Sequence, residues 1–178
     1  ITPARETIRA LAKVAEKGIR LALVDRPALG LQACSVAVND SYGGSLALTH
    51  LHELGHRKIL LLTGSEDIPQ VADRNTGIRE SMKEISANQL PQIMELRLDS
   101  MSASNAYDAM MKKIESGVDF TGIICGNDLI ALGAIRALRE KNIAVPEDVS
   151  VIGYDDIDFA GSASVPLTSI SQPAYELG

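Results

Sequence analysis

The chain has 178 residues, of which 46% are apolar and 22% charged, values that are typical of a globular protein with a buried core. This composition excludes a disordered chain and a fibrous repeat. The sequence contains no run of about 18 apolar residues, which is the length that a membrane-spanning helix needs. The net charge is −6, so a basic surface for nucleic acid is not expected. Every charged residue after Lys141 is acidic, which disfavours phosphate binding but suits hydrogen bonds from a hydroxyl-rich ligand.

Helical and strand patterns alternate along the chain. In chain order, we expect a helix from Thr2-Pro3 to Gly18, strands at 19–24 and 35–38, a helix at 40–55, a strand at 58–63, a helix at 73–85, a strand at 95–98, a helix at 103–116, a strand at 122–125, a helix at 129–141 capped by Asn127, strands at 149–152 and 168–171, and a helix from Ala174. The strand at 58–63 lacks polar alternation, so both its faces should be covered. This order predicts an α/β fold with parallel sheets, and the number of units favours two lobes. Because residue 1 lies at the close of a strand-like segment and Gly178 falls inside a nascent helix, we expect the chain to be a fragment.

Polar residues follow most of the predicted strands. Ligands bind beyond the carboxyl ends of strands in open α/β sheets, so these residues are candidates for a site. They are Asp25-Arg26, Asn39-Asp40, Gly64-Ser65-Glu66-Asp67 with the later Arg74, Asp99-Ser100-Met101, Gly126-Asn127-Asp128 and Gly153-Tyr154-Asp155-Asp156. Asp and Asn bridge neighbouring hydroxyls and Arg donates a fork of hydrogen bonds, so the set predicts a site for a polyol or sugar. For any one residue the alternative is a helix cap or a turn.

The sequence offers little for catalysis, a metal or a cofactor. It has no phosphate loop and no nucleophile elbow, and Gly43-Gly44 is more simply a place of close helix packing than a phosphate contact. His52 and His56 are four residues apart, but Gly55 breaks the helix, which favours a surface or capping role. Cys34 and Cys125 lie among apolar residues, so we expect buried thiols in a reducing compartment.

Several stretches together resemble a known family. They are Leu54–Ile59, Arg74–Gly77, Cys125–Asp128, Ala131–Ala134, Val145–Asp156 and Pro166–Ile170. In this order they resemble the effector-binding core of LacI/GalR-type bacterial transcription regulators over nearly the whole chain, and Val145–Asp156 is the most specific part. The resemblance implies the fold of type I periplasmic sugar-binding proteins, with two Rossmann-like lobes, the first incomplete here. It assigns 1–39 and 160–178 to the amino-terminal lobe and 40–159 to the carboxy-terminal lobe, with the DNA-binding helix-turn-helix absent from this chain.

The resemblance also implies ligand contacts. Arg74 is similar to an arginine that clamps effector hydroxyls or a carboxylate, Asn127 to an asparagine that caps a helix and reaches the ligand, and Asp155 to an aspartate that bridges hydroxyls. Arg26 falls where the family varies its specificity contact. Met101 stands where many members carry a stacking aromatic, which weakens the case for a pyranose stacked on a ring. Further candidates are Asn39, Asp128 and Asp156, of which the two aspartates are more simply capping groups.

The resulting hypothesis is the effector-sensing and dimerisation core of a cytoplasmic regulator, most simply a repressor. A sugar, sugar derivative or nucleoside would bind in the cleft between the lobes and change the affinity of a homodimer for operator DNA, which a domain missing from this chain would contact. One alternative is a periplasmic sugar-binding protein of a transporter, and a signal peptide upstream in place of a helix-turn-helix would identify it. Another is an α/β enzyme with Asp155 or Asp128 as the catalytic residue.

Overall fold

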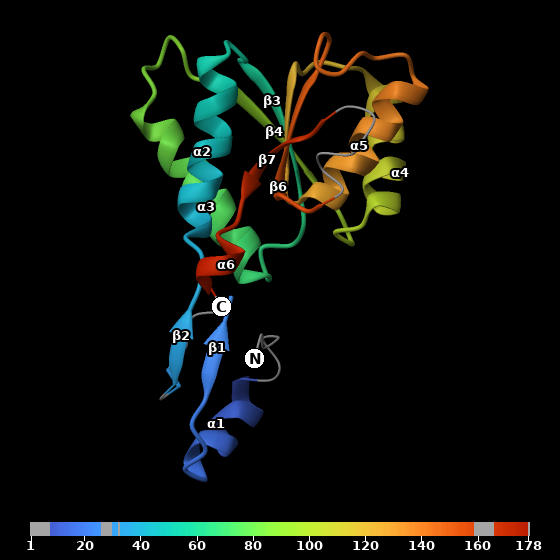
Figure 1. The fold of residues 1–178 in the computed structure, drawn as a ribbon. Helices are drawn as coiled ribbons and strands as arrows, with labels where there is room; N and C mark the ends of the chain where they lie inside the picture. Colours follow the sequence, from blue (N-terminus) through green and yellow to red (C-terminus); the bar gives the residue numbers. More distant parts are fainter. Residues whose placement is uncertain (1–7, 26–29, 32, 159–165, 178) are drawn as a thin grey trace. The chain divides into compact units, whose positions relative to one another are not determined.

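The computed structural model describes residues 8–25, 30–31, 33–158 and 166–177. The chain divides into two units, which we describe separately: a smaller unit of Ile1–Asn39 with Gln172–Gly178, and a larger unit of Asp40–Ser171. Figure 1 colours both along the sequence. Within the described residues, no helix has the length and apolar character needed to span a membrane.

The smaller unit contains two short parallel strands. Its elements are α1 (Ile8–Glu16), β1 (Ala22–Val24), β2 (Cys34–Val36) and α6 (Ala174–Leu177). The strands β1 and β2 pair over three residues, so β1 is shorter than the strand expected at 19–24. Gly18 ends α1 as predicted: its φ is 78° and its N–H donates to Ala15 O. The expected helix start at Thr2-Pro3 lies outside the described residues.

The expectation of two buried thiols is wrong for one of them. Cys125 is fully buried in β5, but Cys34 is exposed on β2. All three residues of β2 are exposed, so the described part of the smaller unit covers neither face of this strand. The apolar neighbours of Cys34 in the sequence predicted a strand covered by other parts of the protein. Among the described residues of the smaller unit, no segment covers β2.

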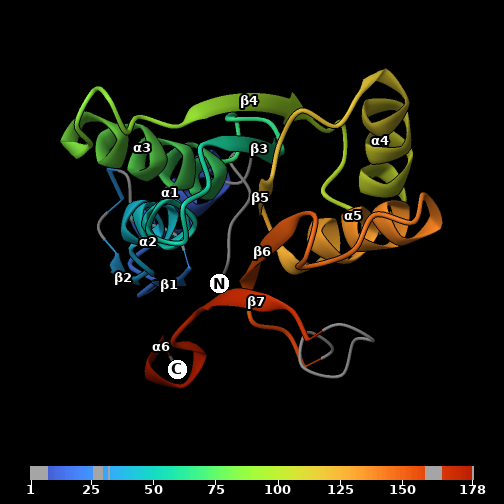
Figure 2. The same ribbon diagram turned by 90° about the horizontal axis from the view of Figure 1, so that it is seen from above.

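The larger unit is a five-stranded parallel sheet with helices on both faces. Its elements are α2 (Asp40–Glu53), β3 (Lys58–Thr63), α3 (Pro69–Glu84), β4 (Gln92–Arg97), α4 (Ala103–Ser116), β5 (Gly122–Cys125), α5 (Asp128–Glu140), β6 (Ser150–Asp155) and β7 (Thr168–Ser171). The strand order is β4-β3-β5-β6-β7, and every pairing is parallel. Figure 2 shows α2 and α3 beside one face and α4 and α5 beside the other. The predicted α/β class is confirmed.

The strand β3, which lies between β4 and β5, is covered on both faces, as the lack of polar alternation predicted. Leu60 and Leu62 pack into a core with the buried side chains of α4 and α5, while Ile59 and Leu61 pack into a second core with those of α2. The side chains of successive strand residues point to opposite faces, so an apolar run feeds both cores at once.

One assignment of the lobes needs correction. Residues 160–178 were expected to belong with 1–39, but Thr168–Ser171 forms β7 of the larger sheet. It pairs with β6 from Ile152 opposite Thr168 to Asp155 opposite Ser171. This pairing also extends β6 through Asp155, three residues beyond the predicted end, because hydrogen bonding to a neighbouring strand sets where a strand ends.

A histidine at the amino-terminal edge of the sheet gives the stability of the larger unit a pH dependence. Nδ1 of His56 lies 2.9 Å from Oγ1 of Thr121. Partial burial, and then the charge of His50, lower the pKa of His56. The folded state therefore disfavours protonated His56 relative to the unfolded chain, and this costs stability as the pH falls below about 6.5.

We expect the free energy of unfolding, measured in urea, to fall between pH 7.5 and pH 5.5, and to fall less steeply in His56→Gln. Glutamine keeps a polar group near Thr121 but does not titrate. Identical pH dependence in the two proteins would contradict this assignment.

Candidate ligand-binding site

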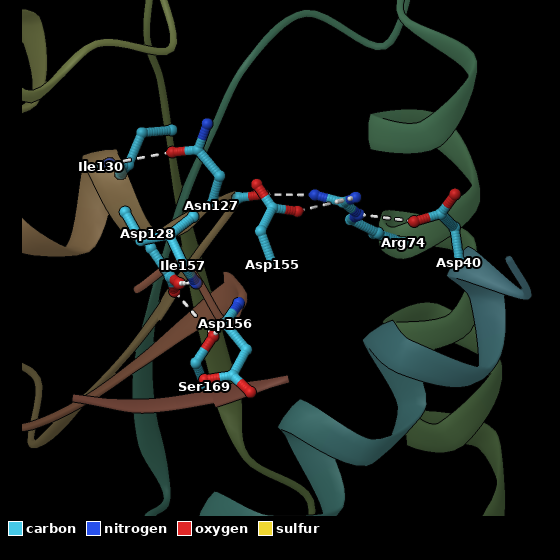
Figure 3. Close-up of polar contacts among 10 residues, drawn as sticks. Asp40, Arg74, Asn127, Asp128, Ile130, Asp155, Asp156, Ile157 and Ser169 are labelled. Carbon is cyan, nitrogen blue, oxygen red and sulfur yellow. Dashed lines mark hydrogen bonds and ion pairs between the residues drawn. The ribbon is translucent and has the colours of Figure 1, made fainter. Parts of the chain in front are cut away.

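Polar side chains meet beyond the carboxyl ends of β5 and β6 in the larger unit. Asn127 and Asp128 follow β5, Asp155 ends β6, and Arg74 reaches this edge from α3. Figure 3 shows these side chains together with Asp40 at the start of α2. The parallel sheet explains the meeting, because all its strands end at one edge.

Arg74 is the centre of this cluster. Its Nε donates to Oδ1 of Asp40 over 2.7 Å, and its Nη1 donates to the carbonyl oxygen of Gly126 over 2.6 Å. Its Nη2 lies 3.5 Å from Oδ1 of Asp155, so the structure brings together the two residues expected to hold a ligand. Each guanidinium nitrogen therefore has a partner, and only 11% of the side chain is exposed.

The ring of Tyr154 packs against the guanidinium of Arg74. The centroid of its ring lies 3.5 Å from Cζ of Arg74, a cation–π contact. Burial, and then the negative charge of Asp40, raise the pKa of the Tyr154 phenol, so it stays protonated at neutral pH. A Cβ on Gly43 would lie 2.1 Å from the phenol oxygen, so this position of α2 must be glycine for the ring to fit.

Two further glycines fix the distance between Asp40 and Arg74. A Cβ on Gly44 would lie 2.0 Å from the carbonyl oxygen of Arg74, and one on Gly77 would lie 1.7 Å from the carbonyl oxygen of Ser41. The helices α2 and α3 thus touch through backbone atoms, which confirms close helix packing at Gly44, whereas Gly43 packs against the Tyr154 ring of β6. The contact between the two helices holds the buried carboxylate of Asp40 against Arg74.

Asp155 is more accessible than Arg74, Asp40 and Asp128, and it has an unusual backbone. Its side chain is 33% exposed, and its φ of 104° lies in the left-handed region that side chains with a Cβ disfavour. Asp156, which is exposed, follows with a φ of 55°, and its N–H donates to Oγ of Ser169. Backbone strain of this kind collects at binding sites, where the surrounding structure holds it in place.

The residues that follow β5 have structural roles. Asn127 is the N-cap of α5, as predicted: its Oδ1 accepts a hydrogen bond from the N–H of Ile130 over 2.9 Å. Asp128 has no exposed surface. Its two oxygens accept hydrogen bonds from the N–H of Ile157 and the Oγ of Ser169, so it ties α5 to the segment after β6 and to β7.

The remaining candidates are less tightly connected to Arg74. Met101 is half-buried and packs against Gly64 and Gly126, since added Cβ atoms there would lie 2.8 Å and 3.2 Å from its side chain. It therefore lies beside Gly126, the residue whose carbonyl oxygen Arg74 binds. Asn39 is exposed and belongs to the smaller unit, and Arg26 lies outside the described residues.

Two members of the cluster, Asp40 and Tyr154, were among the residues expected at the strand ends, but neither was assigned a ligand contact. Asp40 is separated from Arg74 by 34 residues, so only the packing of α2 on α3 shows their pairing. Gly44 of α2 and Gly77 of α3 were the signals in the sequence that such a close approach was possible.

Other reactive side chains have different surroundings. The Nε2 of His52 lies 3.2 Å from the carbonyl oxygen of Gln89, whereas His56 contacts Thr121, so the two histidines face different partners. No group of three or more His, Cys, Asp or Glu side chains in the described part of the chain could hold a metal ion. Burial, and then the charge of Asp128, raise the pKa of the Cys125 thiol far above neutral, which disfavours the reactive thiolate.

The comparison with protein families matches the periplasmic-binding-protein-like domain to residues 48–178. The chain belongs to the periplasmic-binding-protein-like domain family. Curated relatives of the domain are transcriptional regulators. The chain is 38% identical over 141 residues to the HTH-type transcriptional repressor PurR of Aliivibrio fischeri (strain MJ11), covering 79% of this chain and 42% of that protein. It is 36% identical over 140 residues to the ribose operon repressor of Escherichia coli (strain K12), again covering 79% and 42%.

Solved structures agree with this assignment of the domain. A LacI-family transcriptional regulator from Enterococcus faecalis V583 with bound ribose superimposes with a TM-score of 0.86 at 27% identity, covering 99% of this chain and 63% of that one. A LacI transcriptional regulator from a Rhodococcus species gives 0.84 at 30% identity, covering 98% and 63%. The resemblance to the effector-binding core of LacI/GalR-type regulators is confirmed.

The comparisons also bear on the alternatives. The relatives are regulators rather than enzymes, and they do not favour a transporter subunit. The chain spans less than half the length of these curated relatives.

Proposed function

We propose that this chain is the effector-binding core of a LacI-type transcriptional repressor and that it binds a small sugar-like ligand. The observation that carries the proposal is the pairing of Arg74 with Asp155 at the carboxyl end of the sheet. The ribose bound in the Enterococcus regulator supports a ligand rich in hydroxyl groups.

The chemistry of the cluster fits binding without chemical change. The partly exposed carboxylate of Asp155 accepts hydrogen bonds from ligand hydroxyls, and Arg74 donates beside it. Asn127 follows Gly126, whose carbonyl oxygen Arg74 binds. Met101 offers an apolar contact in place of an aromatic ring. Among the three aspartates, Asp155 is the strongest candidate for a ligand contact, because its side chain reaches solvent while those of Asp40 and Asp128 are buried.

Ligand binding acts on DNA through a conformational equilibrium. A ligand that prefers one conformation of the core shifts the population toward it. Coupling of about 1–3 kcal/mol changes operator affinity by about 5- to 150-fold. The complete proposal is a cytoplasmic homodimer that contacts operator DNA through a segment outside this chain.

Asp155→Ala tests the proposal. We expect it to weaken binding by about 100-fold or more, because it removes two charge-assisted hydrogen bonds of about 1.5–3 kcal/mol each. The experiment screens the full-length protein by thermal shift against sugars, sugar derivatives and nucleosides, and then measures the strongest binder by calorimetry in both proteins.

The matched control is Asp108→Ala, which removes an exposed aspartate from α4 and should leave affinity unchanged. Circular dichroism shows whether the Asp155 variant keeps its fold. Unchanged affinity in a folded Asp155→Ala protein would remove the basis of the proposal.

A further inference from the structure

The positive charge of Arg74 is already balanced by carboxylates of the protein itself. Asp40 and Asp155 lie at two of its nitrogens, the carbonyl of Gly126 lies at the third, and Tyr154 covers a face of the guanidinium. An arginine that binds a phosphate or carboxylate ligand usually offers the ligand a pair of parallel N–H groups. Here an anionic ligand has to displace a carboxylate from the guanidinium.

The two carboxylates are not equivalent. Only 6% of Asp40 is exposed, and the backbone contacts of Gly44 and Gly77 hold its helix against α3. Asp155 is 33% exposed and ends a strand, so it can turn toward a ligand. When Asp155 turns to accept hydroxyl hydrogen bonds, Asp40 still compensates the charge of Arg74.

We propose that Asp40 is a specificity-determining residue that restricts this site to uncharged polyhydroxy ligands and excludes their phosphorylated and carboxylated forms. The inference rests on the proposed function and deepens it. An uncharged sugar takes hydrogen bonds from Arg74 and gives them to Asp155 with no net repulsion. An anion placed there faces two carboxylates and one guanidinium, an unfavourable charge balance in a partly buried site.

The test compares uncharged sugars with their phosphate esters in the full-length protein. The probes are D-ribose beside D-ribose 5-phosphate and D-glucose beside D-glucose 6-phosphate, measured by calorimetry at low ionic strength. We expect an uncharged sugar to bind at least about ten-fold more tightly than its ester. Asp40→Asn keeps the size of the side chain and one oxygen toward Arg74. It should reduce the ratio of the two affinities by about ten-fold, because the ester binds more tightly when this carboxylate charge is gone.

The matched control is Asp119→Asn. It changes the net charge by the same amount but lies before β5 at the opposite end of the sheet, where Asp119 pairs with Lys113 on the surface. This variant should leave the ratio unchanged. A second measurement needs no variant: in the unsubstituted protein the ratio should shrink as salt rises from about 0.05 M to 0.5 M, because salt screens charge repulsion.

The outcomes separate the two proposals. Three results would overturn the role of Asp40 and leave the proposed function standing. They are tighter binding of an ester than of its uncharged sugar, an unchanged affinity ratio in folded Asp40→Asn, and an affinity ratio that does not depend on salt. If neither member of either pair binds, nor any other compound of the screening panel, both proposals fail.

Discussion

Replacing Arg74 with methionine should abolish ligand binding and lower the free energy of unfolding by about 3–5 kcal/mol. The stability loss follows from Asp40, whose nearly buried carboxylate loses the guanidinium that contacts it over 2.7 Å. Tyr154 loses its cation–π partner, and the carbonyl of Gly126 loses a donor. Urea denaturation monitored by circular dichroism measures the change.

A neighbouring arginine provides the control. Arg79 lies on the same helix, pairs with Glu66 over 2.9 Å and is 52% exposed. Arg79→Met should cost less than about 1 kcal/mol, since exposed ion pairs contribute little. The double variant Arg74→Met with Asp40→Asn should recover part of the loss because no unpaired charge remains. Equal stability of the Arg74 and Arg79 variants would contradict this account of the cluster.

Gly77→Ala should destabilise the larger unit by about 3 kcal/mol, at the upper end of the cost of overpacking. The added Cβ would lie 1.7 Å from the carbonyl oxygen of Ser41, and a backbone atom in a helix moves only with the helix. As α2 moves away from α3, Asp40 should also move away from Arg74. We therefore expect weaker ligand binding alongside a lower Tm in thermal unfolding.

Thr76→Ala is the control for this position. Thr76 is the preceding residue of α3, is exposed, and donates its hydroxyl to the carbonyl oxygen of Ala72. Its loss should change stability by no more than about 0.5 kcal/mol. If Gly77→Ala is as stable as Thr76→Ala, the close approach of the helices does not constrain this site.

The features predicted well from the sequence depend on neighbours along the chain or on periodicity. The apolar run of β3 predicted two covered faces, and Asn127 was a recognisable cap because its hydrogen bond spans three residues. The carboxyl-end rule placed Asp155 at the polar edge of the sheet, and the family resemblance added Arg74, whose Nη2 lies 3.5 Å from Oδ1 of Asp155.

The features that were missed depend on packing between distant segments. The pairing of Asp40 with Arg74 requires α2 and α3 to touch, and the end of β6 depends on β7, which lies further along the chain. Asp128 was expected to be a capping group more simply than a ligand contact. Its burial and its hydrogen bonds with Ile157 and Ser169 fit a structural role, but the sequence did not identify these two partners.

The unequal surroundings of the two cysteines make the chain convenient to label. A thiol-reactive dye should attach to the exposed Cys34 in the native state and spare Cys125, which is buried and holds its proton. Cys34 lies in the smaller unit, whereas Arg74 and Asp155 lie in the larger one. A change in dye emission on adding sugar would therefore show that ligand binding in the larger unit alters the surroundings of Cys34 in the smaller unit. The experiment needs no introduced cysteine.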